Sequence, residues 1–195
     1  MKKFLQSYPF TDPKILLVEG FSAYDGVLGD QIGAPHKGID YTLKIDDTCI
    51  PFEVHAMHDG IAFQGKSASW GTFVIIHTGS AKGIRLSTIY AHLDSLAISI
   101  ASQYIEQDDQ KIRNPQGTLI HAGQKIGRSG TTGWTNGINQ LHVEVHLKNE
   151  ATNETVKLDP YGLNDQASSN RYPQPGSSLT GLDHMWLTDL PPMAS

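Results

Sequence analysis

The feature that most constrains the fold is a series of short apolar runs, rich in β-branched residues, that Gly, Asp and Asn separate. Runs of this kind are typical of β-strands, and the residues between them favour tight turns. They cover residues 50–54, 60–63, 72–77 and 141–146. We therefore expect a mostly β protein built as a compact antiparallel β-sheet domain.

The chain length of 195 residues fits one domain. Residues 95–106 mix period-2 and period-3.6 spacing of apolar side chains, which predicts a short helix or an insertion. After residue 160 the composition shifts to Ser, Asn, Gln, Pro and Gly. We expect residues 1–29 to form an N-terminal extension packed on a domain of residues 30–160. Residues 161–195 are expected to form an irregular C-terminal tail that lies on the surface and buries little.

Charge and cysteine content exclude several classes of function. The net charge of -5 provides no basic surface for a polyanion, so we expect no nucleic-acid partner. A single cysteine, Cys49, excludes an internal disulfide and a thiolate-rich zinc site. Nitrogen and oxygen atoms must hold any metal, and the chain has 9 His to supply them.

The first residues do not show the apolar run of a secretory signal. The early apolar run at residues 15–18 is far shorter than the ~20 residues of a membrane helix. No membrane span is therefore expected.

His36 and Asp40 form the first pair of candidate ligands. They lie four residues apart with Gly38 between them, and they can converge on one ion if the chain curls. An ordinary loop histidine and a turn aspartate are the alternative.

The segment 140–146 is the second candidate, because strand alternation places Gln140, His142, Glu144 and His146 on one face. Side chains two residues apart on a strand are separated by about 6.6 Å, and those four apart by about 13 Å. His142 and His146 are therefore not expected to share an ion. The same alternation in residues 89–93 places Tyr90 and His92 on one face.

Taken in order, the segments APHKGIDY, VHAMHDGIAFQG, GTFVIIHTG, IYAHLDSL, GTLIHAGQKIGRSGTTG and LHVEVH resemble the lysostaphin-like (LytM-type) zinc endopeptidases. The resemblance implies a groove across one sheet and assigns the metallopeptidase domain to residues 30–160. It also implies a Zn²⁺ ion held by His36, Asp40 and His142. Three protein ligands and one open position are typical of a catalytic zinc.

The resemblance implies that His92 is one of two catalytic histidines, but the position of the other is occupied by Gln140. A Gln side chain can orient a water molecule but cannot accept a proton near pH 7. Two hypotheses stay open: an endopeptidase in which His92 or Glu144 supplies the base, and a catalytically impaired module that binds cell-wall peptides or a partner protein. A biotinyl- or lipoyl-type carrier is disfavoured because no lysine lies in a carrier-type motif.

The implied substrate is a peptide in the cross-links or stems of bacterial peptidoglycan. Tyr90, Trp134 and Asn139 are the expected substrate-binding residues, with plain packing an equal alternative for Trp134. The family resemblance implies a periplasmic or extracellular protein, which we expect to be a monomer.

The other histidines are expected to have ordinary roles. We expect surface or turn roles for His55 and His58, packing for His77, and exposure for His121 and His184.

Overall fold

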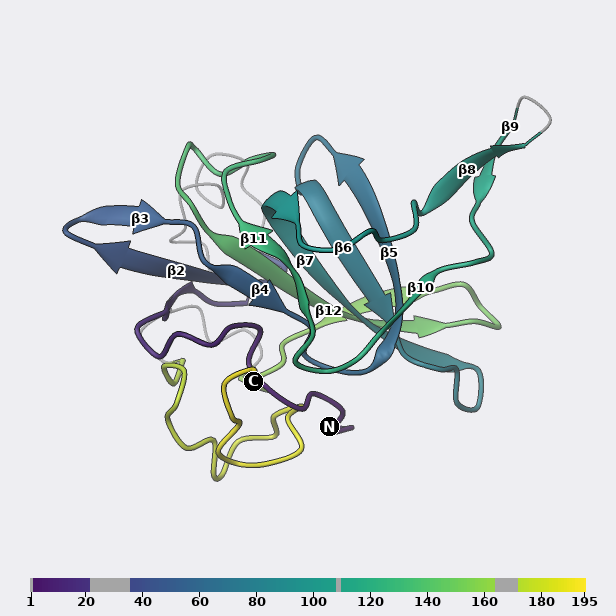
Figure 1. The fold of residues 1–195 in the computed structure, drawn as a ribbon. Helices are drawn as coiled ribbons and strands as arrows, with labels where there is room; N and C mark the ends of the chain where they lie inside the picture. Colours follow the sequence, from purple (N-terminus) through teal and green to yellow (C-terminus); the bar gives the residue numbers. More distant parts are fainter. Residues whose placement is uncertain (1, 22–35, 108–109, 164–171) are drawn as a thin grey trace.

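The computed structural model describes residues 2–21, 36–107, 110–163 and 172–195, and within these ranges it contains strands and no helix. The expected mostly β, antiparallel architecture is confirmed (Figure 1). The strands are β1 (Leu16–Glu19), β2 (Ile39–Ile45), β3 (Thr48–Ile50), β4 (Glu53–His55), β5 (Gly60–Ser67), β6 (Gly71–His77), β7 (Ile84–Leu96), β8 (Tyr104–Gln107), β9 (Gln110–Arg113), β10 (Thr118–Ile120), β11 (Lys125–Ser129), β12 (Leu141–Asn149) and β13 (Thr155–Leu158). No described segment is a helix that could cross a membrane.

One large sheet carries most of these strands, in the order β1-β2-β12-β7-β6-β5-β10. Strands β3, β4, β11 and β13 join it as side branches, and β8 and β9 form a separate hairpin. The centre of the sheet is the pair β12 and β7, which contain the two segments, residues 140–146 and 89–93, to which strand alternation was applied. Their neighbours β2 and β6 come from distant parts of the chain, so the sheet brings residues near position 40 beside residues near position 142.

The two faces of the sheet differ in what covers them. The main core lies on one face and includes Tyr90, Val143 and Val145. The N-terminal and C-terminal segments lie together below the sheet in Figure 1, and Leu5 pairs with Trp186 there. A second, smaller cluster on the opposite face contains Phe73, Ile75, Ile89 and Ala91, with Trp70 packed against it.

The C-terminal tail corrects one expectation. It is irregular, as predicted, but it does not lie on the surface, because Leu179, Met185 and Trp186 are all fully buried. A few large apolar side chains fill the core even though the surrounding composition is polar.

Residues 95–106 form no helix, so the expectation of a short helix is wrong, and the expectation of an insertion stays a prediction. The segment leaves the end of β7, runs beside β5 through the Gln64–Ser102 bridge and continues into β8. The backbone N–H of Gln103 donates to the carbonyl of Gln64. Hydrogen bonds to the exposed edge of β5 satisfy the backbone N–H and C=O groups of this segment. The segment therefore does not need the internal hydrogen bonds of a helix.

Strand β7 changes partners along its length, and a bulge marks the change. Its first part pairs with β12 up to Ala91, and its last part pairs with β11 from Leu93 onward. Between them His92 has a φ of 62°. A positive φ is uncommon outside glycine and typically occurs where a strand bulges.

Candidate metal centre

The candidate ligands meet because β2 and β12 pair with Asp40 directly opposite His142. His36 lies just before β2, and the chain between His36 and Asp40 passes over the His142 ring. A Cβ at Gly38 would lie 2.6 Å from Cε1 of His142, so the glycine is required for this close approach. The chain between His36 and Asp40 therefore curls, as it must if both residues are to bind one ion.

Three ligand atoms converge at this point. Nε2 of His36 lies 3.0 Å from Nδ1 of His142, and Nδ1 of His142 lies 2.7 Å from Oδ1 of Asp40. The third distance, from Nε2 of His36 to Oδ1 of Asp40, is 3.3 Å. Tetrahedral zinc with bonds near 2 Å places its ligand atoms about 3.3 Å apart. The nitrogen and oxygen atoms present thus fit a zinc ion in kind and in spacing.

Both histidines are oriented by groups behind them. The Nδ1–H of His36 donates to the carbonyl of Gly20 at 2.9 Å, which directs the lone pair of Nε2 toward the centre. Nε2 of His142 donates to Oε1 of Glu144 at 3.2 Å, which directs Nδ1 inward. Carboxylate and carbonyl partners of this kind set the tautomer of metal-binding histidines.

Glu144 is a supporting residue whose role the sequence did not reveal. It is only 2% exposed, and Lys157 and the Nε1–H of Trp70 donate to it along with His142. Its other oxygen lies 2.5 Å from Nε2 of His146. His146 therefore contacts Glu144 rather than the candidate ligands, as the spacing on the strand indicated.

The charges at the centre favour a cation. Burial opposes ionisation of Asp40, but His36 and His142 outweigh it and hold the pKa of Asp40 well below its ordinary value. Burial likewise opposes the charged form of His142, but Asp40 and Glu144 outweigh it and raise the pKa of His142. Without a metal, protons on the imidazoles balance the carboxylates, and a divalent cation would displace them.

The bulge in β7 directs His92 toward this centre. Its ring centroid lies 5.7 Å from that of His142, and its Nδ1–H donates to the carbonyl of Thr132 at 2.8 Å. Burial, reinforced by the charge of His142, lowers the pKa of His92 to about 4. His92 is therefore neutral at pH 7, and its Nε2 lone pair can accept a proton.

The bulge also separates His92 from Tyr90, which corrects the expectation that they share a face. Tyr90 is fully buried in the main core, where its hydroxyl accepts from the backbone N–H of Met57 at 2.8 Å. A substrate cannot reach this side chain. Strand alternation failed here because the positive φ at His92 interrupts it.

A cavity of ≈ 730 Å³ opens beside the centre, within the usual range for ligand sites. Asp40, Gln140 and Asn139 line it, and the amide of Asn139 donates to the carbonyl of Cys49 in the wall. The remaining lining residues come from the end of β1, from the β2–β3 hairpin and from residues 137–138. Trp134 is 50% exposed and is not part of this lining.

Three of the remaining histidines differ from expectation because they are buried. His55 and His58 are 6% and 2% exposed, and His184 is fully buried. Each has a hydrogen-bond partner: Gly123 for His55, Thr88 for His58 and Asp189 for His184. None belongs to the metal centre, so they contribute to packing.

No protein-family model and no curated protein matches the sequence. Solved structures do match. A zinc-containing peptidase from Vibrio cholerae has a TM-score of 0.53 and 24% identity, over 80% of this chain and 39% of that chain. A LytM protein from Ruminococcus gnavus, assigned as a glycyl-glycine endopeptidase, has a TM-score of 0.54 and 23% identity, over 81% of this chain and 58% of that chain. The structure of LytU has a TM-score of 0.50 and 19% identity, over 78% and 86% of the two chains.

The chain shares the fold of LytM-type peptidases. At these identities the likeness concerns the fold, and the chain spans only 39% and 58% of the first two neighbours. The fold supports the resemblance found in the sequence motifs, and it places the residues of those motifs in one region.

Proposed function

We propose that the chain is a zinc-dependent endopeptidase that hydrolyses peptide bonds in bacterial peptidoglycan. The observation that carries the proposal is the convergence of His36 Nε2, Asp40 Oδ1 and His142 Nδ1 beside a large cavity. Three protein ligands leave one position open, which is the arrangement of a catalytic rather than a structural zinc.

The geometry supports the following roles. A zinc ion held by these three side chains supplies a Lewis acid when bound. His92, neutral and oriented by Thr132, accepts a proton from the attacking water. Gln140 orients that water or the substrate carbonyl by hydrogen bonding, since it lines the cavity with Asp40. Asn139 contributes to substrate binding in the same cavity, and Trp134, which is exposed and outside the lining, contributes an aromatic surface for the substrate.

Peptidoglycan as the substrate class rests on the motif resemblance and on the assignment of the R. gnavus neighbour as a glycyl-glycine endopeptidase. Such a substrate places the protein in the periplasm or outside the cell. We further propose that it acts as a monomer.

Gln140 supports a second candidate function. Without the second histidine, the chain would be a zinc-containing module that binds cell-wall peptides, or a partner protein, without cleaving them. The two functions predict the same metal content but different products.

Metal analysis and product analysis test both candidates. We expect one zinc per chain after reconstitution, slow cleavage of peptidoglycan or oligoglycine by the natural sequence, and no cleavage by His142→Ala. Gln140→His restores a second base and is expected to accelerate cleavage by about 10²- to 10⁴-fold. Peptide binding without cleavage by the natural sequence would favour the binding module. If Gln140→His also cleaves nothing, the endopeptidase proposal is wrong.

A further inference from the structure

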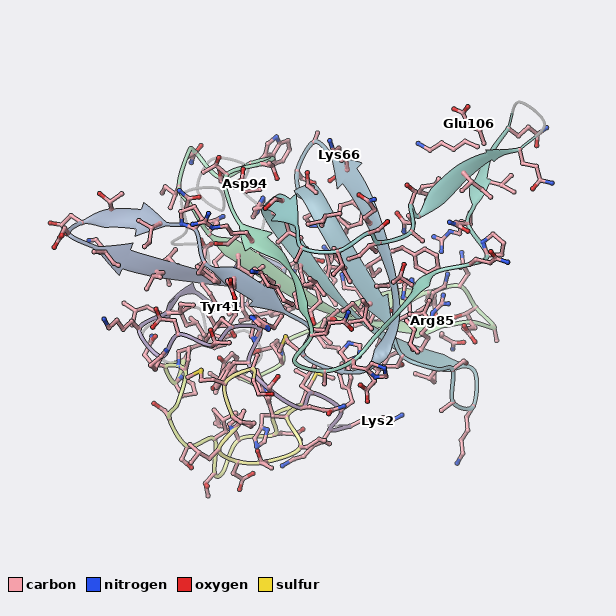
Figure 2. All side chains as sticks on the ribbon, in the orientation of Figure 1. Lys2, Tyr41, Lys66, Arg85, Asp94 and Glu106 are labelled. Carbon is pink, nitrogen blue, oxygen red and sulfur yellow. The ribbon has the colours of Figure 1, made fainter. Side chains whose placement is uncertain are left out.

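A second cavity lies on the metal-bearing face of the sheet, far from the metal centre. It has a volume of ≈ 210 Å³, and we call it the cationic cavity. Its lining residues come from β5, β6, β7 and the base of the β8–β9 hairpin: Phe63, His77, Arg85, Gln103, Arg113, Asn114 and Pro115. Arg85 is labelled in Figure 2, at the edge of the sheet below the hairpin.

The strand registers place this cavity away from the metal centre. His142 lies opposite Ala91 on β7, whereas Lys148 lies opposite Arg85 on the same strand. Ala91 and Arg85 are six positions apart on the extended strand, which is roughly 20 Å. The cationic cavity is therefore a separate site.

Positive charge concentrates at the cavity although the chain as a whole carries a charge of -5. Arg85 and Arg113 line it, and Lys148 lies beside Arg85. Burial, then the charges of Arg85, Arg113 and Lys148, lower the pKa of His77 to about 4. An anion in the cavity would offset these cations.

The arginines have unused hydrogen-bonding capacity. Nε of Arg85 is buried and has no hydrogen-bond partner among the described residues. Glu150 lies 3.7 Å from the Nη1 atom of Arg85, which leaves Nε unsatisfied. Among the described residues no carboxylate forms an ion pair with Arg113. A buried donor without an acceptor is costly, and a ligand oxygen would remove that cost.

We propose that the cationic cavity binds the carboxylate group of a small peptide. Two guanidinium groups match the paired oxygens of a carboxylate, and the ring of Phe63 gives an apolar wall for the adjoining side chain. The volume accommodates one terminal residue, and the negative net charge disfavours a polyanion. This site does not depend on the proposed hydrolysis.

A pair of probes that differ only in charge tests the proposal. N-acetylalanine and N-acetylalaninamide are titrated into the full chain, kept metal-free so that the metal centre binds neither, and the imidazole signals of His77 are followed by NMR. We expect N-acetylalanine to shift these signals with saturation and to raise the pKa of His77, and the amide to leave them unchanged. Equal effects of acid and amide, or no effect of either, would refute the proposal. So would saturation by inorganic phosphate when N-acetylalanine does not bind.

Two variants locate the binding. Arg113→Gln removes one guanidinium from an exposed position and is expected to weaken N-acetylalanine binding by about tenfold or more. Lys111→Gln removes the same charge from the same strand but lies outside the lining, and it should change the affinity less than about twofold. Equal losses in both variants would show a general charge effect and overturn the proposal.

Discussion

At the level of single residues, the candidate metal centre depends on Gly38, because only a residue without a side chain fits beside the His142 ring. Position 38 has no room for a Cβ, because the ring of His142 and the carbonyl of Val143 each lie 2.6 Å from where that atom would be. The identity of this residue therefore controls the positions of ligands on two strands.

Gly38→Ala is expected to lower both stability and zinc affinity. The added methyl must displace the His142 ring or the β2 backbone, at a cost of about 1–3 kcal/mol in the free energy of unfolding. Gly79→Ala is the matched control, because a Cβ there meets no atom within 4 Å. Urea unfolding and zinc competition with a chelator measure the two effects. If the two variants are equally stable, the close approach at position 38 has no energetic consequence.

Glu144→Gln tests the support of the metal ligands. The amide keeps the size of the side chain but loses the charge that faces His142 and Lys157. We expect zinc affinity to fall by about 10- to 100-fold, as for other partners of metal-binding histidines. The exposed Glu154→Gln provides the control for loss of one negative charge. Unchanged zinc affinity in Glu144→Gln would limit Glu144 to packing.

The sequence predicted the candidate ligands but not the residues that support them. His36, Asp40 and His142 could be proposed because each belongs to a recognisable motif. The role of Glu144 depends on Trp70 in the β5–β6 turn and on Lys157 in β13, and no local spacing encodes those contacts.

At the level of elements, the bulge in β7 decides which face His92 occupies. The strand continues on both sides of the bulge, but its partner changes from β12 to β11. One left-handed residue thus turns a side chain from the core face to the metal face.

His92→Asn and His92→Ala separate the chemistry of this residue from its backbone. Both variants lack the imidazole, so we expect both to lose about 10²- to 10⁴-fold in cleavage rate. Asn tolerates a φ of 62° better than Ala, so His92→Ala is expected to be less stable by about 1 kcal/mol. Cleavage assays and urea unfolding provide the measurements. Full activity of His92→Asn would exclude His92 as the base, and equal stability would mean that the bulge does not require the left-handed conformation.

Alternation predicted β12 because its apolar and polar faces are regular, and a short β-branched run predicted β6, which is buried on both faces. It failed at Tyr90, where a bulge interrupts the period, and at residues 95–106, where the apolar residues follow no single period. Backbone pairing with the edge of β5 determines the conformation of residues 95–106. The sequence of this segment does not show that a strand edge is available to pair with it.

At the level of the whole molecule, the two ends of the chain complete the core together. Phe4 and Leu5 donate backbone hydrogen bonds to Met185, and Ala194 donates to Phe10. Composition did not predict this, because Ser, Asn, Gln, Pro and Gly separate the large apolar residues of the tail.

Trp186→Ala measures how much the tail contributes. The side chain is fully buried against Tyr8 and Tyr161, so we expect a loss of about 3–5 kcal/mol in the free energy of unfolding. Leu187→Ala, at a neighbouring position that is 54% exposed, should change the free energy by less than about 0.5 kcal/mol. Thermal or urea unfolding of the full chain compares them. A small effect of Trp186→Ala would mean that the tail is dispensable for the core.

The wall of the larger cavity also contains Cys49, whose sulfur is unpaired and whose side chain is partly accessible. Because it is the sole thiol in the sequence, a maleimide dye attached there would label one position on an otherwise natural polypeptide. Its fluorescence would report when a peptide enters or leaves, so occupancy could be followed in real time whether or not any bond is cut.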